Sequence, residues 1–176
     1  MSRTNPYKRK RRQANKTLLI FGEGMNEQIF LKHLKKLYCC NTNVAITIRK
    51  GKGGNSSNIV IDASRVPGEF NRRVVVLDND KPKGEIEQAR NIAKNKDIEL
   101  IENTPCLEYL LLSILDSSKI SDSSPECKNI FESKYINKKK RKEAYEYDNI
   151  FTKELLEEKR VIIKILDDII QIMEGK

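Results

Sequence analysis

Acidic residues follow two apolar segments of this sequence, at positions where they could bind a divalent cation. Glu23 stands between two glycines after the apolar run 17–21, and Asp78 and Asp80 follow the β-branched run 73–77. Carboxylate oxygens are the ligands that Mg²⁺ and Mn²⁺ prefer in proteins. Side chains two apart in an extended segment point to the same side, so both aspartates can address one ion. We therefore predict a site for Mg²⁺ or Mn²⁺ at Glu23, Asp78 and Asp80.

The two runs have the features of strands in a parallel sheet. The first turns at Gly-Glu-Gly into a helical pattern over about 26–37, and the second precedes an amphipathic helix over 85–95. Strands alternating with helices predict an α/β fold with a mostly parallel, Rossmann-like sheet flanked by helices. Such sheets bind ligands at the carboxyl ends of their strands, where Glu23 and Asp78 would lie. The competing interpretation makes the two aspartates turn-forming residues before Pro82.

Further elements complete a four-stranded sheet. Two more strands are predicted at 44–48 and 98–101, and a helix at 58–65 opens with Ser57 as its N-cap. A strongly apolar helix then starts with Thr104 as its cap and Pro105 at its first position.

Glu108 lies in the first turn of that apolar helix, shortly after Asn103. As a fourth carboxylate near a strand end, Glu108 is a candidate accessory group of the site, and we include Asn103 with it. The alternative for Glu108 is a favourable interaction with the helix dipole.

The chain divides by composition into three parts. Residues 1–15 are a basic flexible arm, 16–116 an α/β domain, and 117–176 a helical C-terminal extension packed on or beside it. A single terminal helix is predicted over 152–173, with a wide apolar stripe. That stripe either packs on the sheet or pairs with a partner chain, which leaves a homo-oligomer or another protein as an expected partner.

The net charge of +9 favours a polyanionic partner such as DNA or RNA. Cations gather in the arm, in a glycine-rich loop and after the second acidic segment. The candidate phosphate-binding residues are Arg9, Lys10, Arg11, Arg12, Arg49, Lys50, Lys52, Lys81 and Lys83. The alternative interpretation of the arm is a solvated tail, and that of the glycine-rich loop is a plain flexible connection. The loop lacks the Walker A order, which argues against an ATPase.

Other classes are disfavoured. No run approaches the length of apolar sequence that a membrane span needs, and the first residues lack the apolar segment of a secretory signal, so we expect a cytoplasmic protein. Four cysteines without C-x-x-C spacing and one histidine do not form a zinc pattern.

The acidic motifs, their order and the segment 103–108, Asn-Thr-Pro-Cys-Leu-Glu, together resemble the RloB-like family, a prokaryotic group that carries a Toprim-type domain. The similarity covers roughly residues 8–116. It implies a Toprim-like fold, Glu23 as general acid/base or metal ligand, and Asp78 and Asp80 as magnesium ligands. It also implies a metal-dependent nuclease that cleaves phosphodiesters, by analogy in anti-phage defence.

Two other classes remain open from the sequence. A non-catalytic nucleic-acid-binding module of a defence or restriction-associated complex would need only the cations. A receiver-like or phosphotransferase domain also places aspartates at strand ends, but it usually has an acidic pair after its first strand, where this chain has Glu-Gly.

Overall fold

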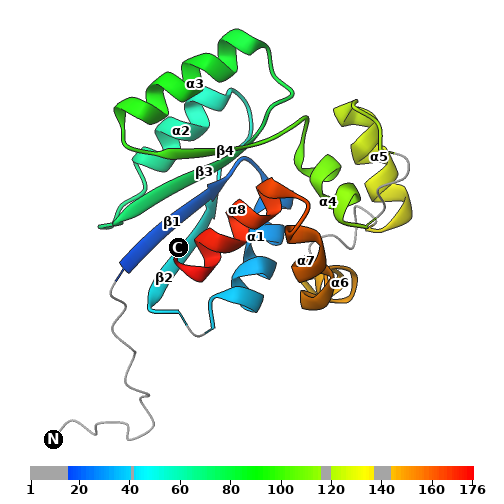
Figure 1. The fold of residues 1–176 in the computed structure, drawn as a ribbon. Helices are drawn as coiled ribbons and strands as arrows, with labels where there is room; N and C mark the ends of the chain where they lie inside the picture. The colour runs from blue at the N-terminus through cyan, green and yellow to red at the C-terminus, as the bar shows by residue number, and fades with distance from the viewer. Residues whose placement is uncertain (1–15, 41, 116–119, 137–143) are drawn as a thin grey trace, which may run out of the picture.

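The computed structural model describes residues 16–40, 42–115, 120–136 and 144–176 (Figure 1). The predicted arm at 1–15, with its four candidate cations, therefore lies outside the described residues. The sheet has four strands, all parallel, in the order β2-β1-β3-β4, which confirms the predicted α/β class. Their bounds are β1 (Lys16–Gly22), β2 (Val44–Lys50), β3 (Arg72–Asp78) and β4 (Glu99–Asn103).

Helices connect the strands and continue after β4. The connecting helices are α1 (Met25–Tyr38), α2 (Ser56–Ser64) and α3 (Lys83–Asn95). The later helices are α4 (Leu107–Leu115), α5 (Ser124–Lys134), α6 (Ala144–Ile150), α7 (Lys153–Arg160) and α8 (Lys164–Glu174).

Alternation along the strands divides the core between the two faces of the sheet. Leu18 and Ile20 of β1 contribute to one cluster, whereas Phe21, together with Val75 and Leu77 of β3, contributes to the other. Helices α2 and α3 cover the face with the smaller cluster, while α1 and α8 lie on the opposite face (Figure 1). The sheet is thus covered on both faces, as parallel sheets require.

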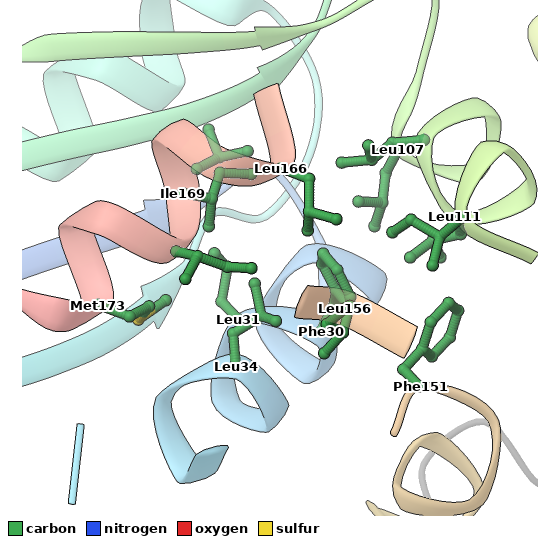
Figure 2. Close-up of a cluster of buried hydrophobic side chains, with 14 of the residues drawn as sticks. Phe30, Leu31, Leu34, Leu107, Leu111, Phe151, Leu156, Leu166, Ile169 and Met173 are labelled. Atoms are coloured by element: carbon green, nitrogen blue, oxygen red, sulfur yellow. The ribbon is translucent and has the colours of Figure 1, made fainter. Parts of the chain in front are cut away.

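The C-terminal helices share the larger core with the α/β part of the chain. Figure 2 shows their side chains pointing toward those of α1 and α4. Of the two interpretations of the terminal apolar stripe, the structure shows packing within the chain. The labelled residues of this core are Phe30, Leu31, Leu34, Leu107, Leu111, Phe151, Leu156, Leu166, Ile169 and Met173.

The prediction of one terminal helix was wrong, because the chain turns between α7 and α8. Leu156 before the turn and Leu166 after it are both fully buried in the same core. One straight helix would hold them about 15 Å apart along its axis. The turn leaves Val161 and Ile162 exposed at 84% and 73%. Since the segment has neither Pro nor Gly, its periodicity gave no sign of the break.

Two predicted helix starts were also wrong. The N-cap of α2 is Asn55, whose side chain accepts a hydrogen bond from the Ser57 backbone, so Ser57 lies inside the helix. Helix α4 begins at Leu107, after a cis Thr104–Pro105 bond, so Pro105 is not its first residue.

Arg160 holds the turn between α7 and α8, and this arrangement predicts a pH-dependent stability. It donates to Asp167 at 2.7 Å and to Glu174 at 2.9 Å. The bond from Arg160, together with one from Lys176 and against the opposing effect of burial, lowers the pKa of Glu174 from 4.5 to about 2. A depressed folded-state pKa stabilises the fold above pH 4.5, and this contribution is lost as the pH falls toward 2.

Arg160→Met should therefore lower the free energy of unfolding at neutral pH by about 2 kcal/mol. The loss should shrink as the pH falls through the interval in which Glu174 titrates. Denaturant unfolding at several pH values measures it. Lys164→Met, which removes an exposed pair with Asp168, is the control and should cost less than about 0.5 kcal/mol. Equal losses in the two variants would contradict this account.

Candidate metal and catalytic site

The topology brings the first two acidic segments together. From β1 the chain passes to β2 on one side and then crosses to β3 on the other, so the direction of winding changes between β1 and β3. The Glu23 backbone N–H donates to the Val76 carbonyl at 3.1 Å, and the Asp78 N–H donates to Glu23 Oε2 at 3.2 Å. Residues 55 positions apart in the sequence therefore meet at the carboxyl edge of the sheet.

Asp78 is the most buried of the three predicted ligands, with 5% of its surface exposed. Its Oδ1 accepts a hydrogen bond from the Leu107 N–H at 2.8 Å and so satisfies a backbone donor at the start of α4. Burial, followed by the negative charges of Glu27, Glu108 and Glu23, raises the pKa of Asp78 to about 8. The fold thus crowds negative charge around a carboxyl that water barely reaches.

Two lysines lie among the predicted carboxylates. Lys128 Nζ, from α5, lies 3.9 Å from Asp78 Oδ2 and 3.8 Å from Asp80 Oδ2. Lys81 Nζ lies 3.8 Å from both Asp80 Oδ1 and Glu23 Oε1. Because one ammonium reaches both aspartates, the two side chains face a common point.

Glu23 combines partial burial with contacts that suit a proton-handling group. Desolvation raises its pKa, against the lowering effects of the Asp78 backbone N–H and Lys81. A carboxyl with a raised pKa is a better proton acceptor near neutral pH than an exposed one. Gly22 on one side packs closely under α1, where a Cβ would approach Glu27 Cβ at 2.6 Å. The glycine therefore lets the strand run directly into the helix start.

An acidic cavity of about 240 Å³ opens beside these residues. Glu108 points into it from α4 and is only 3% exposed. Its Oε1 accepts a hydrogen bond from Asn26 at 2.7 Å, while Oε2 is buried without a partner among the described residues. The cavity is lined by Glu23, Gly24, Met25, Asn26, Glu27, Gly53, Asp78, Glu108 and Lys128.

Asn103 lies close to this site but is not among the residues that line the cavity. It ends β4 in register with Asp78, and its carbonyl accepts the Asn79 N–H at 2.8 Å. Its side chain is buried, and within the described part of the chain neither its oxygen nor its nitrogen has a hydrogen-bond partner. The structure thus places Glu108 in the lining of the cavity and Asn103 outside that lining.

Two residues of the site were missed from the sequence. Glu27 is buried, its Oε2 accepts the Gly24 N–H at 2.8 Å, and burial raises its pKa to about 6. The spacing of Gly24 and Glu27, three residues apart at a helix start, was an available signal for this contact. Nothing local marks Lys128, which reaches the site only because α5 packs against α4.

The predicted cations fall into two groups. Lys81 touches the carboxylates, whereas Arg49, Lys50, Lys52 and Lys83 are exposed without such contact. Arg49 and Lys50 belong to β2 rather than to the loop, which corrects their predicted place.

Gly53, in the loop that follows, lines the acidic cavity with its backbone at a φ of 78°, a conformation that favours glycine. The loop therefore borders the site, with Lys52 beside it.

Comparison with known proteins gives no assignment: no family model, no curated protein and no solved structure matches this chain. The likeness to the RloB-like family therefore stays a prediction. None of the helices in the described residues has the length and apolar content that a membrane span needs.

The described residues contain no group of three or more His, Cys, Asp or Glu side chains that is already arranged to hold a metal ion. The donors nevertheless have the right chemistry, because they are hard carboxylate oxygens and the buried Glu108 Oε2 lacks a partner. The Lys128 ammonium group contacts both aspartates, so these two carboxylates already attract a cation to one point between them. A hard divalent cation fits this donor set.

Proposed function

We propose that this protein is a metal-dependent nuclease that cleaves phosphodiester bonds in nucleic acid. The observation that carries the proposal is the meeting of Glu23, Asp78 and Asp80 at the carboxyl edge of the sheet, beside the unpartnered carboxylate oxygen of Glu108. Asp78 and Asp80 would hold Mg²⁺ or Mn²⁺, with Glu23 beside them as the proton acceptor. When bound, that ion would neutralise negative charge on the phosphate and make water a stronger nucleophile.

The chain's own residues supply the remaining chemistry. Glu23 would accept the proton of the attacking water, because its carboxyl is half-buried and its pKa is raised. Asp78 is held in place by the Leu107 N–H, so the ligand geometry depends on the packing of α4. Lys81 and Lys128 offer positive charge to a phosphate that approaches the carboxylates.

Lys128 gives this proposal a test of its own. Burial disfavours its charge, but Glu108, Asp78 and Asp80 outweigh burial and raise its pKa, so the ammonium stays charged. Lys128→Gln should slow cleavage about 10- to 100-fold. The same change removes a competing cation from both aspartates, so the melting temperature should rise with Mn²⁺ at least as much as in the wild type.

Lys134→Gln, an exposed change on the same helix, is the matched control. Cleavage rates and melting curves with and without Mn²⁺ measure both effects. Wild-type turnover in Lys128→Gln would show that the contact is only structural.

The alternative is a non-catalytic nucleic-acid-binding module, favoured by the net charge of +9 and the exposed cations of β2 and its loop. From the sequence we also propose membership of the RloB-like family, a cytoplasmic location, a role in anti-phage defence and a protein partner at the C-terminal helices.

The experiment that separates the two functions is incubation of the protein with labelled DNA and RNA pools in Mg²⁺, in Mn²⁺ and in EDTA. A nuclease of the proposed kind cuts at least one pool with a metal and none in EDTA. A binding module retains the pools uncut under all three conditions.

A further inference from the structure

A second pocket, of about 450 Å³, lies beside helix α1. In the described part of the chain, Met25, Gln28, Ile29 and Lys32 of α1 form one side, and Asp148 of α6 contributes to the other. Met25 also lines the acidic cavity, so the two cavities adjoin at this residue. With 37% of its surface exposed, Met25 is among the few large apolar residues that the fold leaves open to solvent.

Two groups that line this pocket, His33 and Lys36, contact a third, Asp148. His33 is buried, with Nδ1 3.0 Å from Asp148 Oδ1 and Nε2 2.7 Å from the Phe151 carbonyl. Lys36 Nζ lies 2.6 Å from Asp148 Oδ2. These contacts tie α1 to α6 and leave His33 and Asp148 few free sites for a ligand. A ligand in this pocket would therefore bind other lining groups.

Other lining groups remain available. Within the described residues, the side chains of Gln28 and Lys32 make no hydrogen bond or ion pair. Met25 and Ile29 present apolar surface beside them. The pocket thus offers apolar faces, one amide that can donate and accept, and one ammonium at its edge.

We propose that this pocket receives an unpaired nucleobase of a single-stranded nucleic acid, next to the phosphate at the acidic cavity. The inference rests on the proposed function for the position of that phosphate. Met25 and Ile29 would contact the flat faces of the base, and the Gln28 amide can pair with the donors and acceptors on its edge. Lys32 would contact a neighbouring phosphate.

The residue that both cavities share is what selects a nucleotide as the occupant. A nucleotide joins an apolar, hydrogen-bonding base to an anion. Here an apolar pocket with an amide adjoins a cavity for a cation and phosphate, and Met25 lines both. A base inside a duplex is stacked and paired, so it would have to leave the helix to enter the pocket, which costs free energy. The geometry therefore predicts a preference for single strands, loops or bulges over continuous duplex.

Binding in EDTA tests this inference without any need for cleavage. Fluorescently labelled single-stranded DNA, single-stranded RNA and their duplexes are titrated with protein at one salt concentration. The wild type should bind a single strand more tightly than the matching duplex. Ile29→Glu should weaken single-strand binding about tenfold, as expected for the loss of one base contact, and change duplex binding much less.

Matched controls remove the effects of charge and folding. The control for Ile29→Glu is Asn91→Glu, which adds the same charge at an exposed position of α3. A second pocket variant, Gln28→Ala, removes no core contact, and its control is Gln88→Ala at another exposed position of α3. Should Ile29→Glu fail to fold, Gln28→Ala carries the test, with a several-fold loss expected.

The inference is overturned if the pocket variants bind single strands as tightly as their controls, or if the wild type binds duplex as well as single strand. A single-strand preference that depends on the pocket, in a protein that cuts nothing with any metal, would support the pocket and reject the nuclease.

Discussion

Replacing Asp78 and Asp80 together with asparagine should abolish the response of the protein to divalent metal. A ligand that binds only the folded state raises its melting temperature by mass action, so Mn²⁺ should stabilise the wild type and leave the double variant unchanged. In EDTA the double variant should be at least as stable as the wild type. The reason is that burial and three neighbouring carboxylates oppose a charge on Asp78, whose pKa is raised to about 8.

Cleavage by this double variant should fall at least about a hundredfold, because the ligands of the metal are lost. Asp62→Asn with Asp97→Asn is the matched control, since both side chains are exposed and distant from the carboxyl edge. Asparagine also suits position 97, where the backbone has a φ of 52°. A normal Mn²⁺ response in the variant at 78 and 80 would place the metal elsewhere.

Glu23→Gln should lower the rate of cleavage by about 100- to 10,000-fold, which is the usual contribution of a group that moves a proton. The amide keeps the size of the side chain and can still accept the Asp78 N–H through its oxygen, so the fold should persist. It cannot take a proton from water, and it repels phosphate less than the carboxylate does. Single-turnover cleavage measures the loss, and Glu87→Gln, an exposed change on α3, should cut like the wild type.

The parts of this site that follow from local sequence patterns could be predicted. The apolar runs before Glu23 and Asp78 are buried strands, and parallel strands have their carboxyl ends at one edge, which placed the two acids near each other. The spacing of Asp78 and Asp80 likewise put both side chains within reach of one cation, as Lys128 now shows. The hydrophobic period of the sequence and the direction of the strands were enough to predict where these residues lie.

Contacts between distant elements could not be predicted in the same way. Lys128 reaches Asp78 only through the packing of α5 on α4, and one sequence carries no local sign of that packing. The turn at 161–163 is similar, because burial of Leu156 and Leu166 in one core overrides a continuous helical pattern. The pocket that shares Met25 with the acidic cavity also depends on α6, which lies more than a hundred residues further along the chain.

The role of Glu23 is best measured by comparing cutting and binding for the wild type and Glu23→Gln, on one labelled nucleic acid at one salt concentration. Binding is measured in EDTA and cutting after addition of Mg²⁺ or Mn²⁺, and melting curves confirm that both proteins are folded. Glu23→Gln should lose turnover while its affinity stays equal or rises. Wild-type turnover in Glu23→Gln, or a folded wild type that binds but cuts with neither metal, would rule out a nuclease that uses Glu23.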